Sequence, residues 1–313
     1  MKQIAATHFS PAKAKQARRR ITSALVVAAT VLLGLGLPPS TAQAAANSAP
    51  TSCPEILLIG ARGSGEGISG NRKDDPYKGL GASVAQFADQ IDKRFDEGSV
   101  RRLPVTYEAA KAETLYPSKL QAGLFVGSAA AAAGSYKTSN LDKYTASVDQ
   151  GIRFAQDQLV TFEANCPETF YILAGYSQGA MVMHQVLLRL ADAGQTNILS
   201  KIVSAVLIAD GDRMNRTGAI RVGSAPWAAE GVRSAFSVGE RDSTPVPRIA
   251  VFDVCVEGDL VCNFSVSRLV KPSVPKTIAA FKKAGKIHTD SYRKKDGPLL
   301  SGIAEQIANR WYS

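Results

Sequence analysis

The sequence predicts an α/β fold: a central, mostly parallel sheet of five strands with helices on both faces, arranged as a three-layer sandwich. Two observations support this. Short, β-branched apolar segments alternate along the chain with longer segments whose apolar residues recur at helical spacing. The short segments are also almost continuously apolar, which is typical of parallel strands buried on both faces.

Each element is assigned from this periodicity. Strands are expected over Glu55–Ala61, Val100–Tyr107, Thr169–Tyr176, Ile202–Asp210 and Arg248–Val254. Helices are expected over Leu80–Phe95, Leu141–Ala164, Ala180–Ala191 and Pro298–Trp311. Because no repeat or Pro/Ser-rich linker divides the chain after residue 46, residues 47–313 are expected to form a single domain.

Two stretches fit the alternation less well. Glu108–Ser139 contains the small-residue run "GLFVGSAAAAAGSY", which suits either a helix or a loop. Asn263–Lys286 is rich in lysine, which indicates either a solvated helix face or a cap or surface-binding element beside the active site. Its lysines are Lys271, Lys276, Lys282, Lys283 and Lys286.

The first 46 residues have the pattern of a cleaved export signal. A basic segment ends at "RRR", Ile21–Leu37 is apolar, and "TAQAAA" offers small-residue cleavage sites. A membrane anchor is the alternative, but the apolar run is short for the ~20 residues that a span needs, and Pro38 and Pro39 follow it. The protein is therefore expected to be secreted, by the general secretory route.

The net charge of +10 comes largely from this early segment. The chain has 37 basic and 27 acidic residues, and six of the basic ones precede residue 46. The remaining 31 basic residues barely exceed the acidic ones, so no nucleic-acid partner is expected.

Four cysteines follow the export signal: Cys53, Cys166, Cys255 and Cys262. An even number in an exported chain predicts two disulfides, with three possible pairings. Cys255 and Cys262 are seven residues apart, which suits a small closed loop and leaves Cys53 with Cys166. A zinc site is the alternative, but the chain lacks a CxxC pair and nearby histidines, so no metal is expected.

The strongest motif is Gly175-Tyr176-Ser177-Gln178-Gly179, which matches G-x-S-x-G. A nucleophilic serine on a tight strand-to-helix turn needs neighbours without side chains, and the helix that follows directs its amides at a developing oxyanion. Because the motif lies between an expected strand and an expected helix, Ser177 is predicted to be a catalytic nucleophile.

The general base is found by elimination among three histidines. His8 lies in the export signal, and His184 follows Ser177 on the same expected helix, about 10.5 Å further along, so it is interpreted as a packing residue. His288 remains, in the loop-like segment "KIHTDSY". A late histidine also suits the order serine, acid, histidine of α/β-hydrolases.

Five aspartates between Ser177 and His288 could orient the histidine: Asp210, Asp212, Asp242, Asp253 and Asp259. Asp210 and Asp212 follow the strand after the expected nucleophile helix, which is one strand earlier than the usual position of the triad acid. Asp253 is expected inside a strand, with a local hydrogen bond. Asp259 is favoured because a short loop between Cys255 and Cys262 would hold its carboxylate rigidly.

The motifs "GYSQG" and "CVEGDLVC", with a later histidine and tyrosine, resemble the cutinase family of secreted serine esterases. The resemblance implies an α/β-hydrolase fold, with Asp259 as the triad aspartate inside a disulfide loop. It also implies a second disulfide from Cys53 to Cys166, a cysteine eleven residues before Ser177. The early "ARGSGEG" then implies that Ser64 helps to form the oxyanion hole, with the Gln178 amide as second donor.

The glycine-rich "GARGSGEG" has an alternative interpretation as a phosphate-binding turn. It lacks G-K-[ST], and G-x-G-x-x-G is not matched in register, so no nucleotide or other cofactor is expected.

The function that follows is hydrolysis of carboxylic esters, either cutin-like polyesters or short- to medium-chain acyl esters, by a monomer. Peripheral contact with the cell envelope or a lipid surface is compatible with this function. The alternatives with the same triad are a lipase, a phospholipase or an acetyl-polysaccharide esterase. A non-catalytic surface-binding module that keeps the hydrolase fold is the alternative from a different class.

Overall fold

The computed structural model describes residues 52–66, 75–111, 138–214, 218–236, 249–293 and 297–313. All of them belong to one compact unit spanning Ala46–Ser313. The expected export signal, Asp242 and most of the Glu108–Ser139 stretch lie outside the described residues. No helix in the described ranges is both long and apolar enough to cross a bilayer.

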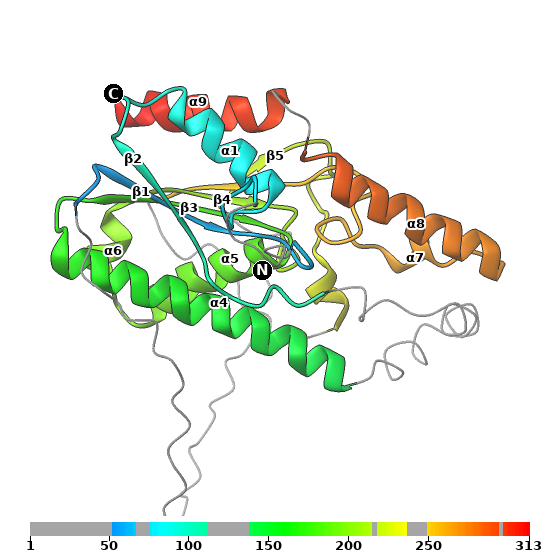
Figure 1. The fold of residues 1–313 in the computed structure, drawn as a ribbon. Helices are drawn as coiled ribbons and strands as arrows, with labels where there is room; N and C mark the ends of the chain where they lie inside the picture. The colour runs from blue at the N-terminus through cyan, green and yellow to red at the C-terminus, as the bar shows by residue number, and fades with distance from the viewer. Residues whose placement is uncertain (1–51, 67–74, 112–137, 215–217, 237–248, 294–296) are drawn as a thin grey trace, which may run out of the picture. The chain divides into compact units, whose positions relative to one another are not determined.

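The centre of this unit is a sheet in which every pair of neighbouring strands is parallel (Figure 1). Its strands are β1 (Ile56–Ala61), β2 (Val100–Pro104), β3 (Phe170–Tyr176), β4 (Ile202–Ile208), β5 (Ile220–Val222) and β6 (Ala250–Val254). They lie in the order β2-β1-β3-β4-β6-β5. The predicted α/β fold with a parallel sheet is confirmed.

The strand count is a correction, since the described residues form a sheet of six strands where the sequence predicts five. The additional strand, β5, has three residues and pairs only with β6 at the edge of the sheet. A segment this short shows no periodicity, and its strand conformation depends on the neighbouring strand.

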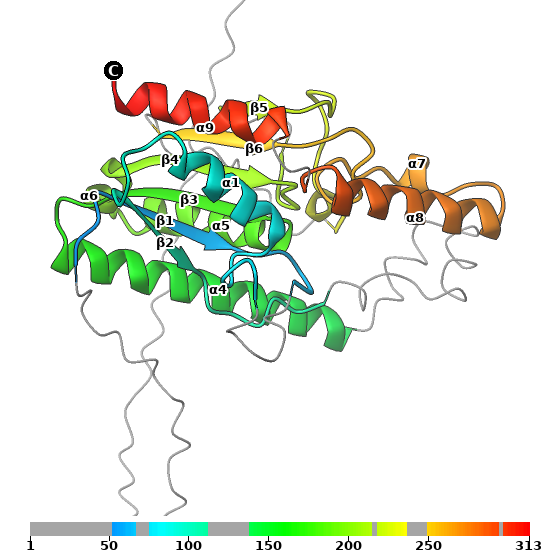
Figure 2. The same ribbon diagram turned by 45° about the horizontal axis from the view of Figure 1, so that its top comes forward.

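Helices cover both faces, because alternate strand residues point to opposite sides. Leu57 and Ile59 belong to the core beneath α4 (Thr138–Asn165) and α5 (Gln178–Asp192). Ile56 and Leu58 belong to the core beneath α1 (Ala82–Asp92) and α9 (Pro298–Trp311). Figure 2 shows the two layers on either side of the sheet.

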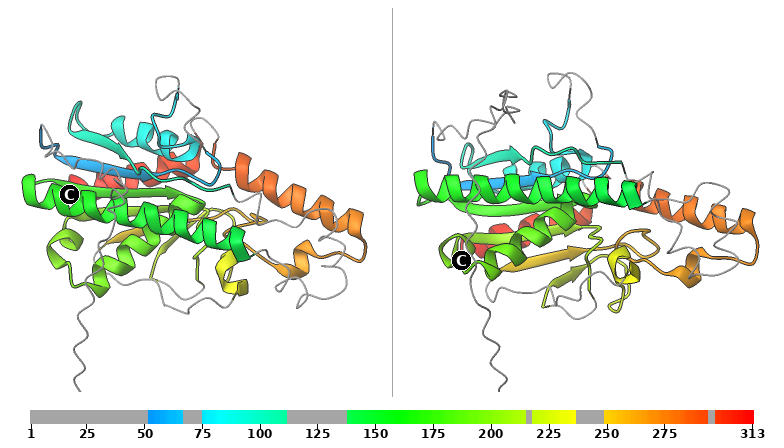
Figure 3. Two further views of the ribbon diagram at one scale, coloured as in Figure 1. Left: turned by 60° about the horizontal axis from the view of Figure 1, so that its bottom comes forward. Right: turned by 90° about the horizontal axis from the view of Figure 1, so that it is seen from below.

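Three further helices were not assigned from the sequence: α6 (Thr196–Ser200), α7 (Val266–Leu269) and α8 (Val274–Asp290). Together α7 and α8 account for most of the lysine-rich stretch, and they lie side by side beyond one end of the strands (Figure 3). Four of its lysines, Lys276, Lys282, Lys283 and Lys286, are exposed on α8. This arrangement agrees with the solvated-face interpretation of the helix.

Two disulfides brace the fold. Cys53 bonds to Cys166 with an S–S distance of 2.01 Å, which ties the segment before β1 to the residue that follows α4. Cys255 bonds to Cys262 at 2.06 Å and closes a short loop directly after β6. We call residues 255–262 the disulfide loop.

Candidate active site

Ser177 occupies a tight turn between β3 and α5, with a positive φ of 54°. The turn requires both flanking glycines, since a Cβ on Gly175 would collide with the Gly179 carbonyl oxygen, and a Cβ on Gly179 would collide with that of Ala61. The G-x-S-x-G pattern therefore has a steric cause: strand β1, the turn and the start of α5 approach too closely for side chains. The parallel register, which pairs Ala61 with Gly175, brings the end of β1 to this point.

His288 lies within hydrogen-bonding distance of the serine, with its Nε2 at 2.9 Å from Ser177 Oγ. Its position corrects the sequence interpretation, because His288 is in the last turn of α8 and not in a loop. The helix continues through the polar residues around His288. The ring of Tyr176 stacks on the imidazole at a centroid distance of 5.2 Å, and the Tyr176 hydroxyl donates to the His288 carbonyl at 2.8 Å.

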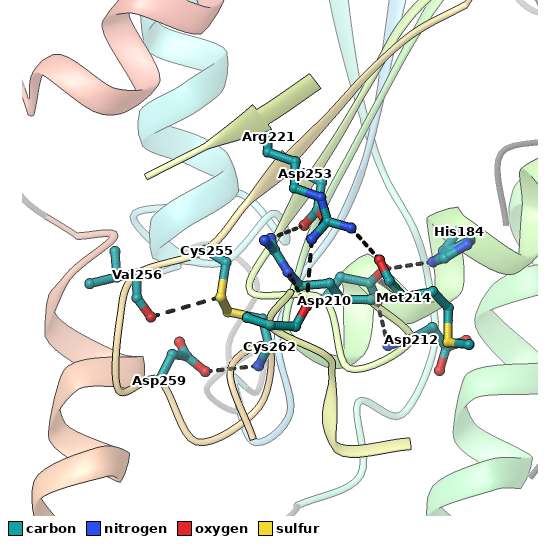
Figure 4. Close-up of polar contacts among 12 residues, drawn as sticks. His184, Asp210, Asp212, Met214, Arg221, Asp253, Cys255, Val256, Asp259 and Cys262 are labelled. Atoms are coloured by element: carbon teal, nitrogen blue, oxygen red, sulfur yellow. Dashed lines mark hydrogen bonds and ion pairs between the residues drawn. A yellow bond between two sulfur atoms is a disulfide. The ribbon is translucent and has the colours of Figure 1, made fainter. Parts of the chain in front are cut away.

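Asp259 lies on the other side of the imidazole. Its two carboxylate oxygens are 2.9 and 3.1 Å from His288 Nδ1. The disulfide loop holds this carboxylate through the amides of Val261 and Cys262, which donate to Oδ1 at 2.6 and 3.1 Å. Figure 4 shows Asp259 beside the Cys255–Cys262 disulfide.

The environment of Asp259 favours its ionised form. Burial alone would raise the pKa of this carboxyl, which is 1% exposed. The charge and hydrogen bond of His288, together with the two loop amides, outweigh burial and hold the pKa below its usual value. A buried, ionised carboxylate can orient an imidazole and stabilise its cationic form.

Tyr292 is a site residue whose contacts the sequence did not indicate. Its hydroxyl donates to Asp259 Oδ2 at 2.9 Å and accepts a hydrogen bond from the Val256 amide at 2.9 Å. Burial, and then the charge of Asp259, raise the pKa of Tyr292 well above 10, so the hydroxyl remains a donor. Its position soon after His288 is visible in the sequence, but the sequence does not show that its hydroxyl reaches the acid.

The loop after β1 packs against the start of α5, where the Ala61 and Arg62 carbonyls lie close to Gly179. Ser64 is in this loop, half-buried, and its hydroxyl donates to the Ala110 carbonyl at 2.5 Å. Gln178 is the first residue of α5, and the first amides of a helix have no partner within the helix. The two expected oxyanion-hole residues therefore lie on segments in mutual contact.

Glu66 binds backbone amides beside the glycine-rich turn. Its carboxylate accepts from the Gly63 amide at 2.7 Å and from the Ala82 amide at the start of α1 at 3.3 Å. Arg293 also bonds to this carboxylate at 2.8 Å. Two backbone amides beside this turn therefore already bind a carboxylate of the chain, which would compete with a phosphate.

The remaining described aspartate candidates belong to a different cluster (Figure 4). Asp210 Oδ2 is 2.6 Å from His184 Nδ1, so the buried His184 is held in an ion pair and is not only a packing residue. Asp212 binds Arg233 at 2.7 Å. In strand β6, Asp253 bonds to two arginines, Arg213 at 2.7 Å and Arg221 at 3.5 Å.

The His184–Asp210 pair predicts a dependence of stability on pH. Burial lowers the pKa of His184, but the charge and hydrogen bond of Asp210 outweigh it and raise the pKa to about 9. Because this value exceeds the ~6.5 of an unfolded chain, the pair stabilises the fold fully below pH ~6.5 and loses its contribution as the pH rises through about 9. Each unit of difference between the folded and unfolded pKa values corresponds to about 1.4 kcal/mol in the free energy of unfolding.

Urea unfolding between about pH 6 and about pH 9 measures this effect, and the free energy of unfolding should fall over that interval. His184→Gln is the comparison, because it keeps a polar side chain but removes the titrating group. An equally steep fall in His184→Gln would contradict the assignment.

The Cutinase family model matches residues 121–272. No curated protein sequence matches the chain. Among the described residues, no group of three or more His, Cys, Asp or Glu side chains could hold a metal ion.

Several solved structures are similar to this chain at low identity. An acetylxylan esterase is 19% identical and covers 83% of this chain and 98% of its own, with a TM-score of 0.47. A cutinase-like protein from Cryptococcus sp. is 18% identical over 84% of this chain and 98% of its own, with a TM-score of 0.46. The catalytic core domain of the acetyl xylan esterase from Trichoderma reesei is 19% identical over 76% of this chain and 98% of its own, also with a TM-score of 0.46.

Proposed function

The chain belongs to the cutinase family of carboxylic ester hydrolases, and we propose that it hydrolyses its esters with Ser177, His288 and Asp259 as a catalytic triad. The observation that carries this proposal is the continuous chain of contacts from Ser177 Oγ to His288 Nε2 at 2.9 Å and from His288 Nδ1 to Asp259 at 2.9 Å. The same order of atoms defines serine hydrolase triads on unrelated folds.

In the proposed mechanism, Ser177 Oγ attacks the ester carbonyl carbon while His288 Nε2 takes the hydroxyl proton. The tetrahedral intermediate collapses to an acyl-enzyme when His288 returns that proton to the leaving alcohol. Water then attacks the acyl group, with His288 again acting first as base and then as acid. Asp259 and the C-terminal end of α8 both favour the cationic imidazole formed in each half-reaction.

The proposed oxyanion donors are the backbone amide of Gln178 and the hydroxyl of Ser64. The amide is favoured by its place at the positive end of the α5 dipole. For the second role, the Ser64 hydroxyl must leave the Ala110 carbonyl, to which it donates at 2.5 Å, and turn towards the oxyanion. Loss of one such donor typically lowers kcat by ~10²–10³-fold.

We also propose that residues 1–46 are a cleaved export signal and that residues 47–313 act as one secreted, monomeric domain. The two disulfides support this, because such bonds persist in oxidising compartments. Once residues 1–46 are removed, the small excess of basic residues gives no reason to expect binding of nucleic acid. The exposed lysines of α8 are compatible with contact at the cell envelope.

The test is hydrolysis of p-nitrophenyl esters from acetate to palmitate by the purified protein. We expect kcat/KM to be highest for short to medium acyl chains, as for a cutinase-like esterase. A maximum at palmitate would indicate a lipase, and activity on acetate alone would indicate a deacetylating esterase. No turnover on any ester would contradict the proposal and favour a non-catalytic module.

A further inference from the structure

A cavity of about 630 Å³ lies between α7, α8 and the disulfide loop. Its volume is within the ~300–1,000 Å³ that is typical of small-molecule sites. Gly258 and Asp259 contribute from the disulfide loop and Ile287 from α8, whereas neither Ser177 nor His288 lines it. The cavity therefore adjoins the candidate triad without including its serine or histidine.

One wall of the cavity is apolar. Leu260, Leu269 and Ala284 line it, and they form a small buried cluster separate from the two main cores. Phe264 and Phe281 pack against this cluster. The wall joins α7 and α8 to the disulfide loop, and because its three residues are already buried, a hydrocarbon chain in the cavity would pack against the small apolar area that they leave exposed.

The lining also carries three cations, Arg268, Lys271 and Lys283. Within the described part of the chain, none of them forms an ion pair, and the guanidinium of Arg268 bonds only to Asn263, at 2.7 and 3.3 Å. Two acids, Glu257 and Asp259, also line the cavity, and the Asp259 carboxylate is already hydrogen-bonded to His288, so three cations face two acids. Because like charges around a cavity repel, a bound anion would stabilise this arrangement.

We propose that this cavity binds an anionic single-chain amphiphile, of which a fatty carboxylate is the simplest example. The hydrocarbon chain lies along Leu260, Leu269 and Ala284, and the carboxylate lies among Arg268, Lys271 and Lys283. A solvated helix face would explain why lysines are present here. It would not explain why cations surround a cavity that has an apolar wall. The proposal does not rest on the hydrolytic mechanism, since it concerns binding at residues other than the nucleophile and base.

The experiment is a calorimetric titration of the purified protein with monomeric decanoate, below its micelle concentration. Lys283→Ala should weaken binding by about tenfold, because it removes a cation that contacts the carboxylate. Lys282→Ala is the matched control, because Lys282 is also exposed on α8 but does not line the cavity. The affinity of this variant for decanoate should equal that of the unmodified protein. The uncharged analogue decanol should bind at least tenfold more weakly than decanoate.

A second variant tests the cavity without removing charge. Ala280 lines the cavity and is half-buried, so Ala280→Trp should fill it and abolish decanoate binding. Thermal melting of each variant verifies that the fold is retained. Equal affinities in Lys282→Ala and Lys283→Ala, or unchanged binding by Ala280→Trp, would overturn the proposal. So would capture by phosphatidylglycerol vesicles without binding of monomeric decanoate, which would indicate a membrane contact instead.

Discussion

Replacement of Ser177 by alanine is expected to lower kcat for ester hydrolysis by about 10⁶-fold while the protein remains folded. In the proposed mechanism Ser177 Oγ forms the acyl-enzyme bond, and no other hydroxyl is within reach of His288 Nε2 among the described contacts. The substitution removes a single oxygen from a side chain that is 6% exposed, and it leaves both flanking glycines in place. Steady-state hydrolysis of p-nitrophenyl butyrate and thermal melting measure the two effects.

Ser200→Ala is the matched control, because Ser200 is exposed on α6 and bonds only locally, to the Asn197 carbonyl at 2.8 Å. This variant should retain full activity. A fluorophosphonate probe should label the unmodified protein and Ser200→Ala but not Ser177→Ala, which mass spectrometry detects directly. Full turnover by Ser177→Ala would rule out the mechanism.

Asp259→Asn is expected to have the second largest effect, a fall in kcat of about 10⁴-fold. The change conserves shape but removes the charge that favours the imidazolium, and an amide nitrogen cannot accept from His288 Nδ1. The amides of Val261 and Cys262 also donate to this carboxylate. If the asparagine turned its NH₂ group towards these amides, they would lose their acceptor. The measurement is kcat as a function of pH, together with the melting temperature.

Tyr292→Phe gives a graded comparison, because it removes one hydrogen bond to Asp259 and keeps the carboxylate. We expect it to lower kcat by about tenfold, well short of the effect of Asp259→Asn. Asp290→Asn is the control: this aspartate is exposed at the end of the same helix as His288, and its loss should leave kcat unchanged. A fall of less than tenfold in Asp259→Asn would show that Asp259 does not orient the base.

The main elements could be predicted because each is encoded by residues close together in the chain. The apolar run of β3 and the periodicity of α5 predicted their places to within two residues. The turn between them was visible because Gly175 and Gly179 have a local steric cause. β5 and α8 were not assigned: the first is too short to show a period, and the second has a polar sequence that suits a loop as well as a helix.

The sequence alone determined a parallel α/β fold and a short list of residues able to act as nucleophile, base and acid, because periodicity, turn sterics and residue chemistry are local properties. Only the tertiary structure decided which residues meet. His288 and Ser177 are 111 positions apart, and their contact depends on where α8 ends relative to β3. The hydrogen bond of Tyr292 to Asp259 and the ion pair of His184 with Asp210 were decided in the same way. Contacts of this kind depend on how strands, helices and disulfides are arranged in space, and local sequence does not specify that arrangement.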